Sequence, residues 1–276
     1  MADQQITWSS AYRELIGRNL GLLSDEQQEH LRSRKAAVFG MGGIGGTAFH
    51  ILVRCGIGRF SIVDRDVFDA SNMNRQVFAD RNTIGRRKID VAADWASSVN
   101  PEAQVEKFDR VGEDNIAEIL KAADIAVMGI DSLAPCVIAS RECREMGLPL
   151  VEAWALPYGN VRVFTAETPT LEEAYGLPTA GRPIADISDD EFRKLGLDVL
   201  LGLGKIEGVS AFYSPQAVQR IMEGHISSFA PMVWLSGVLL ALETVKVLLN
   251  WGKPAVAPHF ALYDPFQHRV PGRLEE

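Results

Sequence analysis

The sequence predicts an α/β fold, in which a Rossmann-like, mostly parallel sheet is flanked by helices and joined to a smaller C-terminal part. Two observations predict this fold. Short apolar runs alternate with helical stretches as far as residue 152, which is typical of parallel strands joined by crossover helices. The first helical stretch follows a glycine turn, GMGGIGG at residues 40–46, and such turns join strand to helix in sheets of this type.

Each element follows from its own pattern of apolar residues. Apolar runs of strand length lie at residues 36–39, 60–63, 104–107, 125–130 and 149–152. Helical stretches lie at residues 43–55, 85–98, 113–121 and 133–146. Another apolar run, VRVFTA at residues 160–165, begins the C-terminal part.

The longest apolar helix is expected from Phe229 to Trp251. Glu243 and Lys246 interrupt it, so its uncharged part is too short for a bilayer span, which takes ~20 residues. We therefore expect this helix to lie in the core or in a dimer interface.

The glycine turn has the G-x-G-x-x-G spacing of nucleotide-binding sites. Gly40, Gly42 and Gly45 have no side chains, so backbone N–H groups can approach a phosphate. A helix that begins near Gly43 directs its positive end to the same place. Asp64 ends the next apolar run, 19 residues after Gly45, where a carboxylate can bind ribose hydroxyls. This spacing fits NAD-type and ATP-type sites alike, and a purely structural turn also has it.

The polar and cationic residues that follow the ribose acid favour ATP over a redox cofactor. They are Asp66, Asn72, Arg75, Gln76 and Lys88. Arg75 offers a planar fork for phosphate oxygens, and Lys88 offers a point charge. Two cations in this place suit a triphosphate whose charge is neutralised during attack at phosphorus. Taken singly, Arg75 could equally be a residue of a surface ion pair.

These motifs together resemble the ThiF/MoeB/HesA family, the adenylating enzymes related to ubiquitin-activating enzymes. The motifs that carry the resemblance are GMGGIGG (40–46), DRD (64–66), SNMNRQ (71–76), TIGRRK (83–88), NPEAQV (100–105) and GID (129–131). Their order and spacing match over roughly residues 18–165. A weaker likeness reappears in WLSGVLLALETVK (234–246) and ALYDP (261–265).

The resemblance implies a reaction and a nucleotide site. In this family a carboxylate, often the last residue of a small protein or peptide, attacks the α-phosphate of ATP. Pyrophosphate leaves and an acyl-adenylate forms. By position, Gly43 lies under the phosphates, and Asp64 holds the ribose. The residues that would line the triphosphate are Asn72, Arg75, Gln76 and Lys88.

The resemblance also implies a Mg²⁺ ligand, Asp131, which follows the apolar run DIAVMGI. One carboxylate together with phosphate oxygens and waters is a normal Mg²⁺ shell. Alternatively, Asp131 caps the helix that follows, since Asp caps helices well. The two roles are compatible.

Family members use an arginine from the N-terminal segment of the partner subunit. Arg18 is the candidate in this chain, and Arg13 is the second choice. If Arg18 acts across a subunit boundary, a homodimer is required for activity. Alternatively, Arg18 is a surface residue beside a helix that the capping box SDEQ, at residues 24–27, begins.

The cysteines depart from the family pattern. Many members hold zinc with two C-x-x-C pairs, but this chain has Cys55, Cys136 and Cys143 and no C-x-x-C, so no zinc is expected. The downstream catalytic cysteine of many members is also missing. Cys136 and Cys143 lie seven apart on one helix face and are expected to be buried. We therefore expect the chemistry to stop at the adenylate or to pass it to an external nucleophile.

The composition predicts a cytoplasmic enzyme. Three cysteines without framework spacing fit a reducing compartment, and the first residues lack the basic and apolar regions of a signal peptide. A net charge of −8 argues against general nucleic-acid binding.

We expect three parts along the chain. Residues 1–34 form a helical segment for dimer contacts and the trans arginine, and residues 35–152 form the ATP-binding domain. Residues 153–276 form a substrate-side and dimerisation region. It is expected to contain a mobile loop at about 169–215, within which Ser188 and Glu191 suggest a capping box that begins a short helix, DDEFRKLGLDVLLGL.

Two other functions remain open from the sequence. The first is an ATP-dependent dehydratase of an RNA base, of the threonylcarbamoyladenosine dehydratase type, which the NMNRQ and VNP motifs resemble. The acidic isoelectric point weighs against it. The second is a non-catalytic nucleotide-binding module or a redox Rossmann protein, against which the set of Arg75, Lys88 and Asp131 argues.

Overall fold

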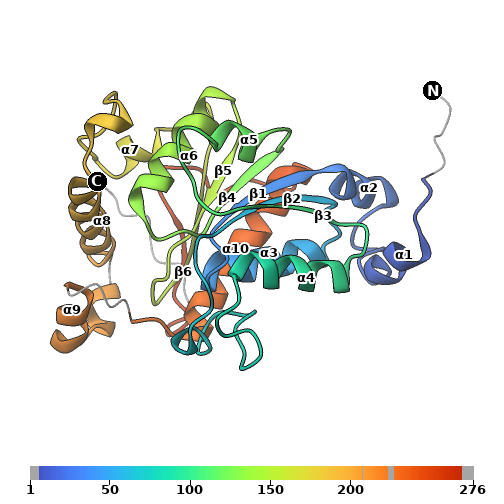
Figure 1. The fold of residues 1–276 in the computed structure, drawn as a ribbon, viewed down its shortest axis with the longest axis horizontal. Coiled ribbons are helices and arrows are strands. Elements are labelled where there is room, and N and C mark those ends of the chain that lie inside the picture. The colour runs from blue at the N-terminus through green and yellow to red at the C-terminus, as the bar shows by residue number, and fades with distance from the viewer. Residues whose placement is uncertain (1–5, 207, 223–226, 269–276) are drawn as a thin grey trace.

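The computed structural model describes residues 6–206, 208–222 and 227–268 and contains a seven-stranded sheet in the order β3-β2-β1-β4-β5-β6-β7 (Figure 1). The first five strands run parallel, and β6 and β7 pair antiparallel at one edge. The predicted Rossmann-like, mostly parallel sheet is therefore confirmed. The ends of the expected N-terminal and C-terminal parts lie outside the described residues.

The elements follow the predicted order, and the predicted bounds differ from the observed ones by at most three residues. The strands are β1 (Lys35–Phe39), β2 (Arg59–Val63), β3 (Gln104–Phe108), β4 (Ile125–Met128), β5 (Leu150–Glu152), β6 (Gly159–Phe164) and β7 (Ala261–Tyr263). The helices up to β6 are α1 (Ser10–Ile16), α2 (Asp25–Ser33), α3 (Gly43–Arg54), α4 (Lys88–Val99), α5 (Ile116–Leu120) and α6 (Leu133–Glu145). The later helices are α7 (Leu171–Ala174), α8 (Asp189–Leu203), α9 (Pro215–Met222) and α10 (Ala230–Leu249).

Helices cover both faces of the sheet, so its central strands are buried throughout. Alternate residues of β1 point to opposite faces. Val38 belongs to one core, which includes residues of α3, α4 and α10, whereas Phe39 belongs to a second core with residues of α5, α6 and α8. The sheet continues from β5 into β6 across residue 152, so the division into domains at this point stays a prediction.

Helix α10 packs on the sheet as a core helix. It is long and apolar enough to cross a membrane by length and composition, but half of that stretch is buried inside the protein. It lies against α3 and β6, and a Cβ at Gly237 would meet Cβ of Thr47 on α3 at 2.7 Å. The expected core role is confirmed, and the dimer-interface role stays a prediction.

The segment 169–215 contains more helix than its Pro and Gly content suggested, and the short helix predicted after Ser188 is confirmed as α8. It contains α7, α8 and two short 3₁₀ helices, Ile184–Asp186 and Val209–Phe212. Arg141 of α6 fixes its first half, because the guanidinium donates to both carboxylate oxygens of Glu172 and to the carbonyl oxygens of Thr179 and Arg182, all within 2.8 Å. A half-buried arginine fork of this kind orders a turn that composition alone assigns to a loop.

The capping box predicted at Ser188 is only half formed. The Ser188 hydroxyl accepts from the backbone N–H of Glu191. The Glu191 carboxylate pairs with Arg182 instead of returning to the backbone at Ser188. The box predicted at residues 24–27 is complete and begins α2, and α1 precedes it in the chain.

The contact between α10 and α3 yields a first prediction. Replacing Gly237 by Val should lower the free energy of unfolding by about 3 kcal/mol, because the new side chain overpacks against Thr47. Val238→Ala on the exposed side of the same helix should change it by less than about 0.5 kcal/mol. Urea unfolding of both variants measures the difference, and equal stabilities would mean that α10 does not pack closely on α3.

Candidate active site

The glycine turn between β1 and α3 is closed by contacts between backbone atoms. Gly40 has a φ of 90°, and a Cβ on it would lie 2.8 Å from the carbonyl oxygen of Gly129. A side chain on Gly45 would collide with the carbonyl oxygen of Gly40, and one on Gly129 would lie 2.5 Å from the nitrogen of Gly45. The missing side chains therefore let the ends of β1 and β4 approach the start of α3.

The first turn of α3 is available to an anion. Gly42 is the N-cap residue, and in the described part of the chain no side chain caps this helix. The first N–H groups of a helix have no partners within it, and its dipole is positive at this end. Together these features make the turn a binding place for phosphate.

Asp64 holds the glycine turn from the end of β2. Its Oδ2 accepts from the backbone N–H of Met41 at 2.7 Å, and its Oδ1 accepts from that of Asp66 at 2.9 Å. Burial raises the pKa of the Asp64 carboxyl above its ordinary value, and the charge of Lys88 opposes this rise. The predicted ribose acid therefore lies directly beside the glycine turn.

Lys88, the first residue of α4, provides a buried cation next to this carboxylate. Its Nζ lies 2.9 Å from Oδ2 of Asp66 and 4.0 Å from Oδ2 of Asp64. Its side chain is only 8% exposed. A cation held between two carboxylates is ready to exchange one of them for a phosphate oxygen.

Gln76 brings an unsatisfied amide to the same turn. Its side chain is buried, and its Oε1 has no hydrogen-bond partner among the described residues. Its Nε2 lies 3.8 Å from the place that a Cβ on Gly42 would occupy. A buried polar atom without a partner costs about 1–3 kcal/mol, so a ligand that supplies a donor would remove this cost.

Two other predicted residues of this segment make contacts within their own loop. The Oδ1 of Asn72 accepts from the backbone N–H of Asp69 and completes the capping box of a 3₁₀ helix, Ala70–Asn72. The Arg75 guanidinium donates to the carbonyl oxygen of Ser71 and to Oδ1 of Asn74. Cγ of Arg75 lies 3.7 Å from the place that a Cβ on Gly43 would occupy, and contacts to a triphosphate stay a prediction for both residues.

Helix α10 covers the glycine turn, which the sequence analysis did not predict. The indole nitrogen of Trp234 donates to the carbonyl oxygen of Arg75 at 2.8 Å. The side-chain amide of Asn74 donates to the carbonyl oxygen of Ser228 at 3.0 Å. A side chain on Gly43 would collide with Val233. No local pattern could have indicated these contacts, because about 160 residues separate the two segments in the chain.

Asp131 lies between β4 and α6 with an exposed side chain. Ser132, not Asp131, is the N-cap residue of α6, so the alternative capping role was wrong. Within the described residues the Asp131 carboxylate makes no hydrogen bond or ion pair, and no group of three or more His, Cys, Asp or Glu gathers that could hold a metal alone. A solvated carboxylate without a partner fits a Mg²⁺ ion whose other ligands are phosphate oxygens and waters.

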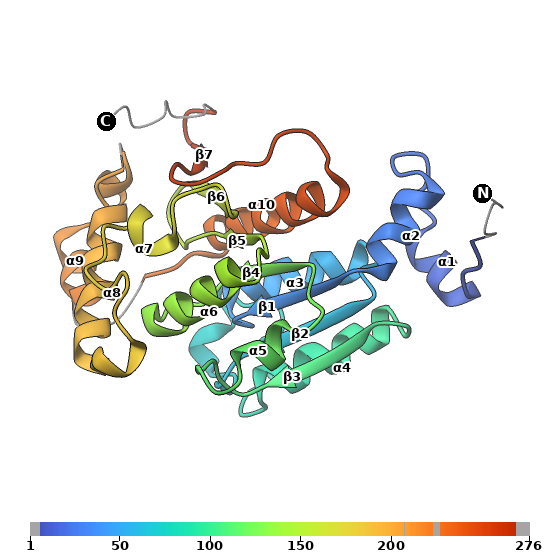
Figure 2. The ribbon, with the colours of Figure 1, turned by 90° about the horizontal axis from the view of Figure 1, so that it is seen from above.

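Arg18 lies near the beginning of β1, at the opposite end of the strands from these residues. It follows α1, and α2 leads directly into the start of β1, whereas the glycine turn follows the end of that strand. The five residues of β1 span about 17 Å. Figures 1 and 2 show α1 and α2 at the far end of the molecule from α8.

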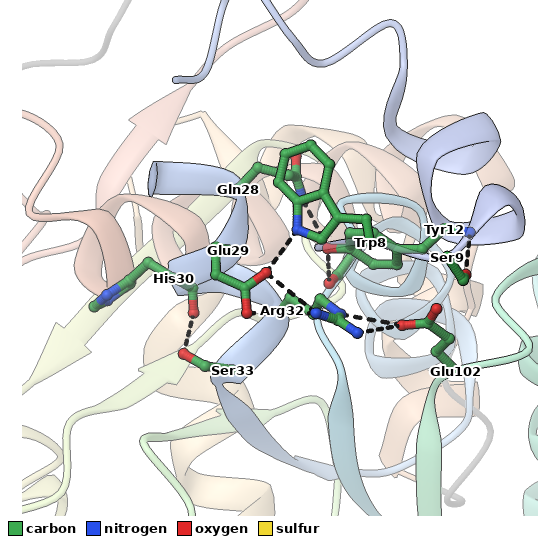
Figure 3. A network of polar contacts seen from close by, with 10 residues as sticks. Trp8, Ser9, Tyr12, Gln28, Glu29, His30, Arg32, Ser33 and Glu102 are labelled. Carbon is green, nitrogen blue, oxygen red and sulfur yellow. Dashed lines mark hydrogen bonds and ion pairs between the residues drawn. The ribbon is translucent and has the colours of Figure 1, made fainter. Parts of the chain in front are cut away.

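A polar network fixes this N-terminal segment in place (Figure 3). Trp8 donates to Glu29 at 2.6 Å, Arg32 pairs with Glu102 at 2.9 Å, and the hydroxyl of Tyr12 donates to the carbonyl oxygen of Gly56. Arg13 stacks on the ring of Trp8. Neither predicted arginine therefore meets the glycine turn of its own chain.

Burial raises the pKa of all three cysteine thiols. Burial raises the pKa of the Cys55 thiol to about 11 and that of Cys143 to about 12. The pKa of Cys136 is raised by burial and further by the charges of Glu152 and Asp131. Cys136 and Cys143 are both buried in α6, as predicted.

Comparison with known proteins identifies the family. A model described as the ThiF family matches residues 16–275. The chain belongs to the ThiF family. The resemblance seen in the motifs is thereby confirmed over nearly the whole chain.

Relatives of this ThiF-family chain include two kinds of enzyme. It is 28% identical over 257 residues to the sulfur carrier protein adenylyltransferase of Thermus thermophilus, covering 93% of this chain and 83% of that protein. It is 32% identical over 145 residues to the tRNA threonylcarbamoyladenosine dehydratase of Escherichia coli, covering 52% of this chain and 54% of that protein. The second match thus spans about half of each protein.

The fold of this ThiF-family chain also matches solved structures. The crystal structure of the E. coli tRNA N6-threonylcarbamoyladenosine dehydratase in complex with ATP superposes with a TM-score of 0.62. It covers 89% of this chain and 98% of that one at 21% identity. This likeness supports the Rossmann-like architecture.

The unsatisfied amide of Gln76 gives a second prediction, in which one substitution raises the stability of the fold and lowers the affinity for ATP. Gln76→Leu should stabilise the nucleotide-free ThiF-family chain by about 1 kcal/mol, because it removes a buried polar atom without a partner. The same change should weaken ATP binding by about tenfold, because Oε1 can then no longer accept a hydrogen bond from a hydroxyl or amino group of the nucleotide. Thermal unfolding and calorimetric titration with ATP measure the two effects.

A loss of stability together with unchanged ATP affinity would assign Gln76 to the fold alone. Gln28→Leu is the matched control, because Gln28 is buried in the N-terminal segment, where its amide donates to Tyr12 and to the carbonyl oxygen of Cys55. That change should lower the stability and leave ATP binding unaltered.

Proposed function

We propose that this protein binds ATP at the glycine turn and adenylates a substrate carboxylate, releasing pyrophosphate. The observation that supports this most directly is the convergence of three groups on one uncapped helix terminus. They are the Asp64 carboxylate, the buried Lys88 ammonium and the unsatisfied Gln76 amide. A redox cofactor would need no buried cation here, whereas a reacting triphosphate does.

Each residue of the proposed site has one task. The N–H groups at the start of α3 and the Lys88 ammonium bind phosphate oxygens, while Asp64 orients the ribose. Arg75 turns its guanidinium from the Ser71 carbonyl toward the triphosphate. Catalysis then consists mainly of positioning and charge stabilisation, because the α-phosphorus needs only an aligned carboxylate and a stabilised leaving group.

Asp131 would hold Mg²⁺ in this proposal. When bound, the ion neutralises phosphate charge and lowers the barrier to departure of pyrophosphate. Asp131 is suited to it because its carboxylate is solvated and lies at the carboxyl end of β4, next to the strand that leads into the glycine turn. We expect no zinc, since the chain has no C-x-x-C pair.

The substrate would be a protein or peptide C-terminus or a small acid, and the protein would act in the cytoplasm. The adenylyltransferase named among its relatives supports a carboxylate substrate. The net charge of −8 makes a nucleic-acid substrate the weaker candidate. The dehydratase among the relatives makes activation of an RNA base the alternative.

The test of this proposal is ATP–pyrophosphate exchange with pools of carboxylates. Wild-type protein should exchange label only with a pool that contains its carboxylate substrate. Arg75→Ala should reduce the exchange rate about 100-fold, the effect of losing roughly 3 kcal/mol of preorganised charge stabilisation. Arg81→Ala is the control, because Arg81 is an exposed arginine of the neighbouring turn.

The exchange assay also separates the functions. No exchange with any carboxylate, although ATP binds, would contradict adenylation of a carboxylate and favour the dehydratase or a non-catalytic nucleotide-binding module. Unchanged exchange in Arg75→Ala would remove Arg75 from the mechanism.

A homodimer that shares Arg18 between its subunits makes a further prediction. Arg18→Ala and Lys88→Ala should each be inactive alone, because each lacks one cation at every site. A refolded mixture should recover about a quarter of the wild-type activity, since half of the subunit pairs are mixed and each mixed pair has one intact site. Pyrophosphate exchange measures it, and no recovery in the mixture would contradict the shared site.

A further inference from the structure

A second pocket lies away from the glycine turn, between α7, α8, β6 and the segment before β7. Its volume is about 520 Å³, within the range of small-molecule sites. Most of its lining is apolar, from residues such as Leu177, Val199 and Leu262. Nothing in the proposed adenylation mechanism uses it.

Arg162 of β6 is a charged residue at the inner wall of this pocket. It is 2% exposed, and its Nε donates to Oε2 of Glu152 at 2.8 Å. Its Nη1 donates to the carbonyl oxygen of Pro258 at 2.9 Å. Rings of Tyr175 and Phe260, which also line the pocket, lie 4.3 and 4.2 Å from the guanidinium carbon.

One amino group of this guanidinium remains unpaired. Nη2 of Arg162 is buried and has no hydrogen-bond partner among the residues that the structure describes. The ion pair with Glu152 already balances the charge, so the site does not require a second full anion. It requires one acceptor oxygen beside an apolar body, because a buried donor without a partner is costly.

The pocket is close to the proposed adenylation site. Glu152 pairs in register with Met128 of β4 on one side and with Arg162 on the other. Two strand spacings of about 4.8 Å therefore separate β4, which leads to Asp131, from Arg162. On α8, a Cβ at Gly196 would lie 3.6 Å from Leu133, two residues after Asp131.

Helix α8 connects the two places. Gly202, which lines the pocket, follows Gly196 by six residues, which is about 9 Å along the helix axis. Gly196 is itself separated from Asp131 by the contact with Leu133 and by two residues of chain, so a substrate with its carboxylate near Asp131 needs a body of about 10 to 20 Å to enter the pocket.

We propose that this pocket binds an apolar or aromatic group of the carboxylate substrate, with an oxygen of that substrate accepting from Nη2 of Arg162. The inference rests on the proposed adenylation, because it assigns the pocket to the substrate of that reaction. Two sources share this chemistry, an apolar side chain near a peptide C-terminus and a small aryl or alkyl acid.

Gly202 allows the pocket to be filled without disturbing the fold. A Cβ on Gly202 would meet nothing within 4 Å, and glycine is a poor helix former, so a larger residue is tolerated there. Because Gly202 lines the pocket and its Cβ would stand in open space, Gly202→Phe is expected to add a ring at the pocket wall. Leu201→Phe is the matched control, because it adds the same ring at the adjacent exposed position of α8, which does not line the pocket.

The experiment measures binding of 3-phenylpropionate and of the peptide N-acetyl-Phe-Ala-Ala by calorimetry, with ATP absent. Wild type and Leu201→Phe should bind at least one of the two at millimolar concentration, and Gly202→Phe should bind it about tenfold more weakly, since the apolar body no longer fits. 3-Phenylpropylamine, which has the same ring and no acceptor oxygen, should not bind. Preference for the peptide or for the small acid distinguishes the two sources.

The kinetic part of the experiment tests whether the pocket serves the reaction. With the carboxylate that supports pyrophosphate exchange, Gly202→Phe should raise KM about tenfold with little change in kcat, and the affinity for ATP should not change. If Gly202→Phe and wild type bind both probes equally, or if neither protein binds them, the proposal that this pocket binds the substrate is wrong. If probe binding depends on Gly202 but no carboxylate supports pyrophosphate exchange, the pocket is a binding site and the proposed adenylation is wrong.

Discussion

The site depends on one constraint, the packing of backbone against backbone at Gly40, Gly45 and Gly129. These glycines come from the end of β1, the start of α3 and the end of β4. Any side chain among them would separate the elements, and the N-terminus of α3 would move away from the edge of the sheet. The uncapped helix terminus lies at the strand ends only because this contact is so close.

The polar residues of the site are arranged around that contact. Asp64 reaches the turn by accepting from the N–H of Met41, and Lys88 is held in turn by Asp66 and Asp64. Helix α10 secures the loop that contains Arg75 and Gln76, through Trp234 and through Val233 against Gly43. A core helix from the end of the chain therefore positions residues near its beginning.

The sequence predicted the parts of this arrangement that are local. Glycine spacing and alternation of apolar runs predicted β1, α3 and β2, and Lys88 was expected near Asp64 because it follows the end of β2 closely in the chain. The cover supplied by Val233 and Trp234 could not be predicted, because it joins segments that are distant in the chain. The ion pair of Glu191 with Arg182 could not be predicted either, since it joins the Glu191 carboxylate to a neighbouring turn instead of to the backbone at Ser188.

The same limit applies to the second pocket. Arg162 and Glu152 lie in two short apolar strands, and only the antiparallel register of β5 and β6 makes them partners. The sequence located substrate recognition after residue 152 from the weak family likeness there, but it did not indicate a buried arginine among aromatic rings. Side-chain pairing across strands has no signature in a single sequence.

The central claim is that a nucleotide triphosphate at the glycine turn is attacked at its α-phosphorus. The most direct measurement is the identity of the products formed from ATP labelled in the α-phosphate or in the γ-phosphate, with the carboxylate substrate in excess. The account predicts labelled AMP or acyl-adenylate from the first and labelled pyrophosphate from the second. Labelled ADP from the first and labelled acyl phosphate, or phosphate from its hydrolysis, from the second would contradict it, because attack would then have occurred at the γ-phosphorus.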